Sequence, residues 1–157
     1  MRKQLISEDR MHPPLSETGW MDLESMVDLE FTSEDGAHPV EAALLLSRNE
    51  GWRAANPGKQ TIRLTFHTPQ NLRRLRLEFV ETSESRTQEF VMRWSQDRGQ
   101  TKRDVVRQQW NFNPDSSTRE VEDLRVELNG ATWLELEIVP NISGGSYASL
   151  LSWRIAG

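Results

Sequence analysis

The stretch TIRLTFHTPQNLRRLRLEF, residues 61–79, decides the fold, because apolar and polar residues alternate along most of it. A period of two is that of a β-strand with one buried face, whereas a helix repeats about every 3.6 residues. The alternation stops at 67–71, where Pro69 predicts a turn between two strands. The two strands share one apolar face, made of Ile62, Leu64, Phe66, Leu75, Leu77 and Phe79.

The same alternation recurs on both sides of this stretch. It returns at 90–94, 124–128 and 134–138, and Asn129-Gly130 between the last two predicts a hairpin. Further strands are predicted at 27–31, 105–112 and 149–156. About eight short strands separated by polar turns indicate an all-β fold, an antiparallel β-sandwich or jelly roll.

The chain length favours a single domain, because 157 residues can bury one good core but hardly two. We expect this domain to cover residues 25–157. Residues 1–24 are predicted to form a loosely ordered leader, in which Pro13-Pro14 would break a helix. The segment VEAALLL, residues 40–46, fits either a helical turn or a buried strand.

Composition excludes several function classes. The chain has no cysteine, so disulfides, thiolate catalysis and cysteine zinc sites are ruled out. Its net charge of −5 argues against general nucleic-acid binding, although 16 of the 19 basic residues are arginine by count along the printed sequence. The first thirty residues hold neither an export signal nor a membrane span, so we expect a cytoplasmic protein that does not bind membranes.

Motifs of catalysis and metal binding are missing. His12, His38 and His67 are far apart in the sequence and have no metal-ligand spacing, so no metal site is predicted. No nucleophile elbow, phosphate-binding loop or dinucleotide fingerprint occurs. We therefore do not expect an enzyme.

Several stretches in order resemble a known family. They are SEDGAHPVEAALL, GWRAANPGKQTIRLTF, LRRLRLEF, FVMRWSQDRG, LEIVP and LLSWRIAG. This order resembles the discoidin domain (factor V/VIII type C) of the galactose-binding-like jelly rolls, over roughly residues 25–157. The resemblance implies ligand binding at the end of the sandwich away from the termini. It leaves calcium open but disfavoured, because calcium-binding members commonly have a Glu where this chain has Ser152, and no other cofactor is expected.

Antiparallel strands bring alternate loops to the same end of a sandwich. The loops at 54–59, 81–87, 113–119 and 140–147 should therefore meet, with Tyr147, Trp52 and Trp110 close by. Arginine and amide side chains over an aromatic floor suit a sugar. The candidate ligand-binding residues are Arg53, Asn56, Arg86, Gln88, Asn111 and Asn113.

Each candidate also has a structural interpretation. Trp52 at the start of a strand fits a core position better than an exposed platform. The amides Gln88, Asn111 and Asn113 could cap backbone groups, and Arg86 could pair with Glu84 or Glu89. Strand arginines are likewise expected to pair across strands, for example Arg74 and Arg76 with Glu135 and Glu137.

Two functions remain open from the sequence. The first is a non-catalytic module that binds a carbohydrate or another polyhydroxylated ligand at the loop end. The alternative is an intracellular protein-interaction or assembly domain of the same fold without sugar binding. Trp20, Met21, Leu23 and Met26 could then cover a sheet face of the same chain or of a second copy, which would give a homodimer.

Overall fold

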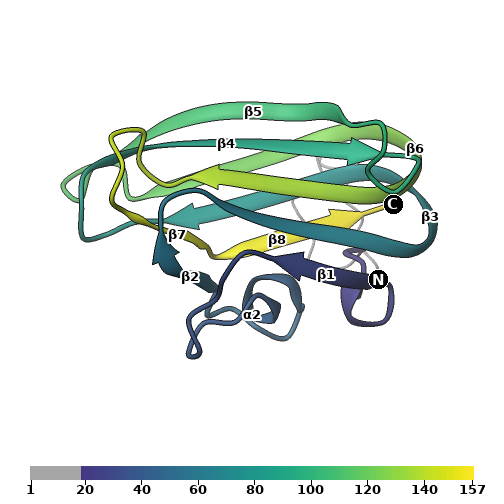
Figure 1. The fold of residues 1–157 in the computed structure, drawn as a ribbon, viewed down its shortest axis with the longest axis horizontal. Coiled ribbons are helices and arrows are strands. Elements are labelled where there is room, and N and C mark those ends of the chain that lie inside the picture. The colour runs from purple at the N-terminus through teal and green to yellow at the C-terminus, as the bar shows by residue number, and fades with distance from the viewer. Residues whose placement is uncertain (1–18) are drawn as a thin grey trace, which may run out of the picture.

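A computed structural model describes residues 19–157, and its strands form two layers (Figure 1). Two short helices accompany eight strands in this part of the chain. The elements are η1 (Leu23–Ser25), β1 (Val27–Phe31), α2 (Glu41–Leu44), β2 (Trp52–Pro57), β3 (Gln60–Val80), β4 (Arg86–Ser95), β5 (Arg103–Phe112), β6 (Arg119–Val139), β7 (Tyr147–Leu150) and β8 (Ser152–Ala156).

The central strands β3 and β6 are each 21 residues long and pair antiparallel with one another along their length. The predicted turn at 67–71 and the predicted hairpin at 129–130 are therefore wrong. The pairing register shifts around Gln70, which lies opposite Ala131, so both strands bend there without ending. Pro69 lies where no ladder pair forms, and its missing N–H therefore costs no sheet hydrogen bond.

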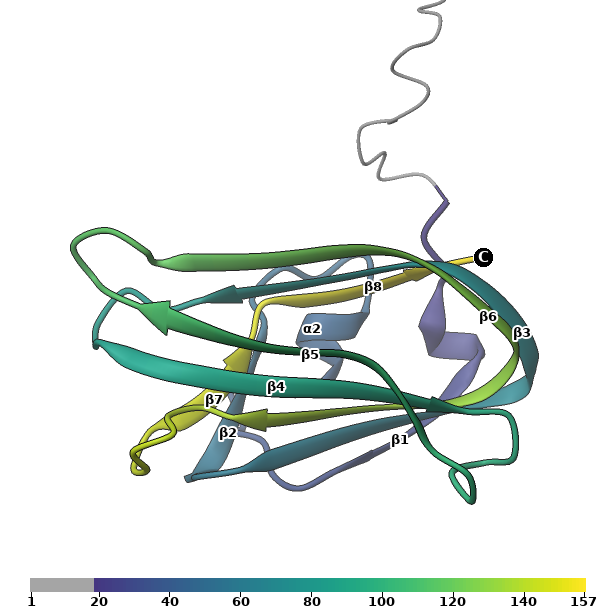
Figure 2. The ribbon, with the colours of Figure 1, turned by 90° about the horizontal axis from the view of Figure 1, so that it is seen from above.

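The glycine of the predicted hairpin has a different role at this bend. Gly130 has a positive φ of 69°, which a residue without a side chain adopts readily. Its N–H donates to the Asn71 side-chain oxygen at 2.9 Å, across the two strands. The turn signals Pro69 and Asn129-Gly130 thus belong to one shared corner of the sheet, and Figure 2 shows both strands bending at the same end.

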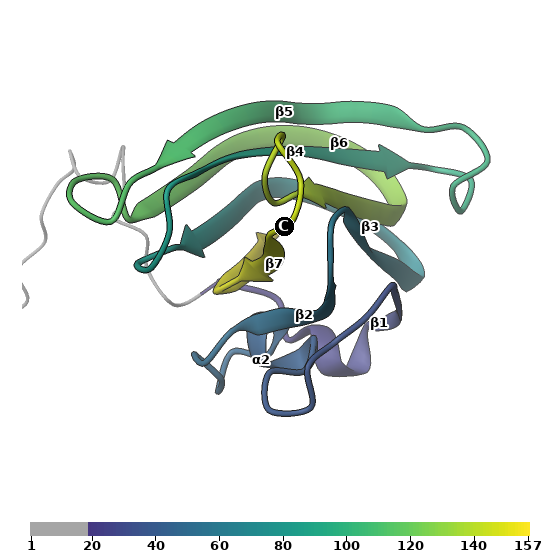
Figure 3. The same ribbon diagram turned by 60° about the vertical axis from the view of Figure 1, so that its left-hand side comes forward.

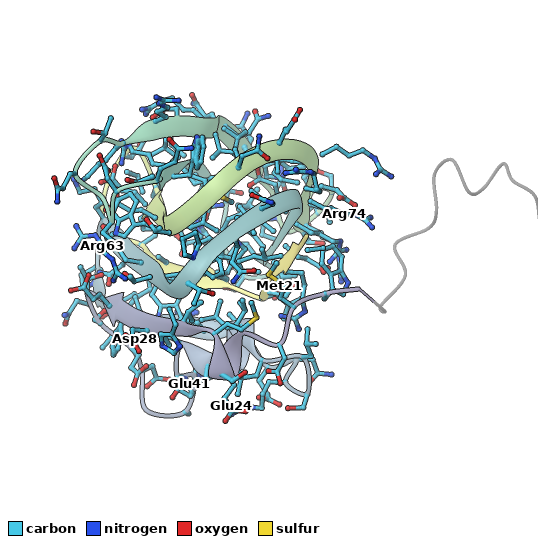
Figure 4. All side chains as sticks on the ribbon, turned by 90° about the vertical axis from the view of Figure 1, so that its right-hand side faces the viewer. Met21, Glu24, Asp28, Glu41, Arg63 and Arg74 are labelled. Atoms are coloured by element: carbon cyan, nitrogen blue, oxygen red, sulfur yellow. The ribbon has the colours of Figure 1, made fainter. Side chains whose placement is uncertain are left out.

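The corner assigns the two halves of β3 to different layers. Its first half pairs with β1 over Ile62–Phe66, and its second half pairs with β8 over Arg74–Glu78. The late half of β6 continues the first layer through β4 to β5, which Figure 3 shows above the small sheet of β2 and β7. Figure 4 shows the consequence for side chains, because Arg63 and Arg74 project on opposite sides of the molecule.

The apolar face predicted for 61–79 forms the core between the layers. All six of its predicted residues are buried, and Phe79 contacts Phe90 of β4 with ring centroids 5.2 Å apart. Burying an aromatic side chain of this kind stabilises a fold by roughly 2–3 kcal/mol. The all-β antiparallel sandwich of about eight strands predicted from the sequence is confirmed.

The ambiguous segment 40–46 begins as a short helix. The helix α2 buries Ala42, Ala43 and Leu44 against the sheets. The Arg154 guanidinium of β8 donates to the backbone carbonyls near its C-terminal end, at 3.0 to 3.4 Å. These carbonyls have no partner within a four-residue helix, so one side chain satisfies several of them. They belong to Ala43, Leu44, Leu45 and Arg48.

The segment before β1 packs onto the same chain. Trp20 is buried and bridges to Ala156 of β8, and Leu23 belongs to the core. Most of the predicted leader, residues 1–18, lies outside the described residues, so the domain division at residue 25 and the homodimer stay predictions. Within residues 19–157, no helix combines the length and apolar character needed to cross a membrane.

Candidate ligand-binding site

Four loops meet at one end of the sandwich, which we call the loop end. They are the β2–β3 loop (58–59), the β3–β4 loop (81–85), the β5–β6 loop (113–118) and the β6–β7 loop (140–146). Figure 1 shows the C-terminus at the opposite end. Backbone hydrogen bonds join these loops, for example from Gly58 to Ser146 at 3.0 Å and from Glu81 to Thr118 at 2.9 Å. The loops predicted to meet therefore do meet.

The main hollow of the loop end has a volume of about 360 Å³. Its lining comes from the start of β4, the end of β5 and the β3–β4, β5–β6 and β6–β7 loops, and most of it carries hydroxyl or amide groups. Among the six candidates, three line it. The lining residues are Ser85, Arg86, Thr87, Asn111, Phe112, Asn113, Asn141 and Ser143.

The amides of the main hollow are held in place by short hydrogen bonds. Asn111 accepts from the Thr87 hydroxyl at 2.7 Å, and Asn113 accepts from the backbone of Asp115 at 2.9 Å. Asn141 accepts from the backbone N–H of Ser143 at 3.1 Å. Their oxygens are thus engaged, while the Nδ2 donors of Asn111 and Asn113 bond to no other described side chain or backbone group. The sequence missed Asn141 and Ser143, because a loop has no periodicity that marks its inward residues.

Two candidate residues lie in the interior. The Arg86 side chain is fully buried and its guanidinium stacks on Phe112, 4.8 Å from the ring centroid. It donates to Glu81 at 2.8 Å and to the carbonyl oxygen of Pro140 at 2.6 Å, so the expected pairing with Glu84 or Glu89 is wrong. Arg86 therefore ties the β3–β4 loop to the β6–β7 loop.

The charge of Arg86 is balanced at Glu81. Burial acts to raise the pKa of Glu81, but hydrogen bonds from Arg86 and Ser83 outweigh it, and this pKa lies below its ordinary value. Glu81 is consequently ionised at neutral pH and holds the guanidinium in place. Arg86 thus lines the main hollow without adding net charge to it, because Glu81 balances the guanidinium.

Gln88 extends this network inward. Its amide oxygen accepts from Arg86 at 3.2 Å, and its Nε2 donates to Glu120 of β6 at 3.2 Å. Gln88 and Glu120 are both 0% exposed. Burial, together with the neighbouring carboxyl of Glu122, raises the pKa of Glu120 to about 8. Gln88 thus joins a neutral carboxyl to the arginine that organises the loops.

The remaining two candidates lie on β2. Arg53 is exposed and its guanidinium lies over the ring of Tyr147, 5.5 Å from the centroid. Asn56 is exposed, and its backbone carbonyl accepts from Gln60 at 3.3 Å. Arg53 also lines a second hollow of about 250 Å³ beside β2 and β7, together with His38 and Ser149. Neither residue lines the main hollow.

The aromatic residues divide into core and surface. Trp52 is 1% exposed and donates its indole N–H to the Ser33 carbonyl at 2.9 Å, so it is a core residue. Trp110 is half-buried against the core. Tyr147, at 40% exposure, is the aromatic of the loop end that faces solvent among the described residues.

Outside the loop end, the described residues hold a smaller hollow with a carboxylate of shifted pKa. The hollow beside the β4–β5 loop has a volume of about 130 Å³ and contains Asp97. Hydrogen bonds from Ser95 and Thr101 lower the pKa of Asp97 to about 2, which is the behaviour of a turn-stabilising carboxylate. No group of three or more His, Cys, Asp or Glu residues within 19–157 is placed to hold a metal. Ser152 supplies no carboxylate, and the expectation about calcium stays a prediction.

The two-layer antiparallel arrangement, whose loops surround the main hollow at one end, is that of a jelly-roll β-sandwich. Among solved structures, the chain is similar to the family 32 carbohydrate-binding module of NanJ from C. perfringens, solved with galactose. The TM-score is 0.63 at 13% identity, covering 87% of this chain and 97% of that chain. These values confirm the predicted resemblance at the level of the fold.

Two more solved structures show how widely this fold is used. A module from a family 31 glycoside hydrolase of Clostridium perfringens matches with TM-score 0.63 and 16% identity, over 88% of this chain and 95% of that chain. Allantoicase, an enzyme, matches with TM-score 0.56 and 12% identity, over 82% of this chain and 39% of that chain. At these identities the likeness establishes the fold alone. No known protein family and no curated protein matches the sequence.

Proposed function

We propose that this chain is a non-catalytic module that binds a carbohydrate, or another polyhydroxylated ligand, at the loop end. The observation that carries the proposal is the main hollow, in which hydroxyl and amide side chains surround the ring of Phe112 and the buried Arg86. Such groups match the alternating donors and acceptors of a sugar ring. The NanJ module, which has the same fold, was solved with galactose, and this supports the class of ligand.

The recognition would combine hydrogen bonding with one aromatic contact. Thr87, Asn111 and Asn113 provide the polar wall, and Asn141 and Ser143 face it from the β6–β7 loop. A sugar that extends along this loop toward β7 would meet Tyr147. An exposed ring of this kind packs on the apolar face of a pyranose.

The absence of catalysis is part of the same proposal. The titratable member of the main hollow lining is Arg86, which is buried and paired with Glu81. A neutral wall of this kind suits binding, whereas acid–base chemistry needs a titratable group that faces the ligand. A cytoplasmic location also remains a proposal, and the lack of cysteine in 157 residues is compatible with a reducing compartment.

The direct test is a glycan array followed by NMR titration of the ¹⁵N-labelled protein with the best glycan and with D-galactose. We expect amide shifts confined to the β3–β4, β5–β6 and β6–β7 loops. Asn111→Ala should raise Kd roughly threefold to tenfold, since one hydrogen bond is lost. Thr68→Ala, an exposed change at the sheet corner, is the matched control and should leave Kd unchanged.

A folded protein that binds no glycan, or that shows shifts away from the loop end, would contradict this function. The second candidate, a protein-interaction domain, would then take its place. It is favoured by the exposed apolar side chains Phe31 and Leu46 beside the β1 edge and α2. Light scattering with size-exclusion chromatography, before and after Phe31→Ser, measures whether this surface joins two copies of the chain.

A further inference from the structure

A line of buried polar side chains connects the interior of the sandwich with two loops of the main hollow. Glu120 accepts from Gln88 at 3.2 Å, and Gln88 accepts from Arg86 at 3.2 Å. Arg86 in turn donates to Pro140 at 2.6 Å and to Glu81 at 2.8 Å. The carboxyl of Glu120 is therefore only two side chains away from both the β3–β4 loop and the β6–β7 loop.

Glu120 is poorly satisfied in its surroundings. It is 0% exposed, and its second oxygen, Oε2, has no hydrogen-bond partner among the described residues. The buried Nη2 of Arg86 and the indole N–H of Trp110 also lack partners there. A buried polar atom without a partner costs stability. A change in the charge of Glu120 therefore favours new hydrogen bonds among these unpartnered groups.

The polar groups that act on Glu120 come from two strands, β6 and β4, and two further strands place uncharged residues near it. On β6, Glu122 disfavours its ionised form, and on β4, Arg86 favours it while Gln88 donates to it. On β5, Trp110 lies opposite Gln88 and is uncharged. On β3, the residue paired with Glu120 is Phe79, which is also uncharged. The balance of charge at this carboxyl is therefore set by Arg86 and Glu122.

We propose that Glu120 is a positioning residue for the loop end, whose protonation state sets how firmly Arg86 holds the β6–β7 loop. When Glu120 is neutral, Arg86 has one anionic partner, Glu81, and its Nη1 stays on the Pro140 carbonyl. When Glu120 is ionised, a second carboxylate attracts the unpartnered Nη2 inward and weakens the contact with Pro140. The loop end is then ordered at neutral pH and loosened at alkaline pH.

The pKa of Glu120, raised by burial to about 8, places this change in the mildly alkaline range. An ordinary exposed carboxyl would titrate several units lower and would leave the loops in one state above about pH 6. The inference extends the proposed function because these loops line the proposed site, but its first test needs no sugar.

That test is a pH titration of the ¹⁵N-labelled protein, followed by ¹H–¹⁵N spectra from about pH 5 to about pH 9.5. Amides of the β3–β4 and β6–β7 loops should shift with one common midpoint in the alkaline range. Glu120→Gln, which keeps the shape and an amide that can bond to Gln88, should abolish this common shift. Glu122→Gln should move the midpoint to lower pH, since it removes the like charge. Glu127→Gln, exposed on the same strand, is the control and should leave the midpoint unchanged.

Loop amides that titrate identically in Glu120→Gln and wild type would overturn the inference, as would a midpoint that Glu122→Gln leaves in place. A second measurement uses D-galactose at about pH 6.5 and about pH 9, where we expect Kd to rise severalfold in wild type and to stay constant in Glu120→Gln. If D-galactose binds at neither pH, the proposed ligand class fails while the amide titration still decides the role of Glu120.

Discussion

The guanidinium of Arg53 on β2 lies over the ring of Tyr147 on β7, with 5.5 Å between Cζ and the ring centroid. The two strands pair antiparallel in the small sheet, where Arg53 is opposite Ser149, two residues from Tyr147. A cation over one ring face contributes about 0.5–1 kcal/mol at an exposed site and restricts the ring orientation. The only tyrosine of the chain is thus fixed beside the β6–β7 loop.

Tyr147→Ala is expected to weaken glycan binding by roughly tenfold, because the apolar face of the sugar loses its aromatic contact. The melting temperature should change little, since the side chain is 40% exposed. Tyr147→Phe keeps the ring and should retain most of the affinity. Isothermal titration calorimetry measures both variants, and equal Kd values for Tyr147→Ala and wild type would remove Tyr147 from the site.

Glu120→Gln should stabilise the fold at neutral and alkaline pH. The folded pKa of about 8 lies above the reference value of 4.5, so the unfolded chain releases this proton first as the pH rises. Folding stability is therefore lost between about pH 4.5 and about pH 8, and no further loss occurs above that range. We expect Glu120→Gln to gain on the order of 1–3 kcal/mol at about pH 8 and much less at about pH 4.5. Urea unfolding at several pH values measures this difference, and a gain independent of pH would contradict the assignment.

Arg154→Ala should loosen the segment that contains α2. It removes the side-chain donor to four backbone carbonyls, of which the Leu45 carbonyl keeps only its bond from the Arg48 N–H at 3.0 Å. We expect a loss of about 2–3 kcal/mol in the free energy of unfolding. Hydrogen exchange should rise in residues 41–48 before it rises elsewhere. Arg125→Ala, exposed on β6, is the control and should cost less than about 0.5 kcal/mol.

Gly99→Ala should disturb the end of the sandwich opposite the site. Gly99 has a φ of +91°, and a Cβ there would lie 2.9 Å from the Trp133 ring. Gly58 has a φ of +90° with open space around it, so Gly58→Ala carries the same backbone strain without the collision. Gly99→Ala is expected to cost about 1–3 kcal/mol more than Gly58→Ala by thermal unfolding, and equal costs would show that the indole moves aside.

Much of the core was predictable from the alternation alone, but the corner of the sheet was not. Ile62 to Phe79 reveal their buried face through a period of two, which needs no knowledge of the partner strand. A register shift is a property of two strands together, so Pro69 and Gly130 each gave a local turn signal and no sign of their shared bend. Two separate turns are therefore predicted from the sequence, whereas the paired strands bend at one shared corner.

The same corner explains why the expected ion pairs were wrong. Glu135 lies in the first layer and accepts from Arg63 and Arg93, at 2.7 and 3.1 Å. Arg74 and Arg76 lie beyond the corner on the other layer. Their partners are Asp123 and Glu78. The Arg74 pair with Asp123 is a cross-strand pair as expected, whereas Glu78 lies on the same strand as Arg76, and neither partner is visible in the sequence.

For the site, the meeting of the loops was predictable from the sequence. The inward direction of the Arg86 and Gln88 side chains was predictable as well, although both were expected to face a ligand. Phe90 was predicted to face the core, and the period of two carries that face back through Gln88 to Arg86. The sequence thus contained the signal that these two residues are buried. Asn141 and Ser143, in contrast, take their positions from the path of an irregular loop.

The shared length of β3 and β6 also governs how the chain must fold. Gln60 pairs with Ile138, so this pairing closes a long loop of chain that includes the β4–β5 hairpin. Such non-local pairings slow folding to about milliseconds or seconds, because closing a long loop loses conformational entropy before the strand contacts can stabilise the chain. On the ribosome, the central sheet could not be completed until β6 had emerged from the exit tunnel. Until then β3 would have only β1 beside its first half, and its edge toward β6 would be unpaired, which makes this interval the point at which aggregation competes with folding.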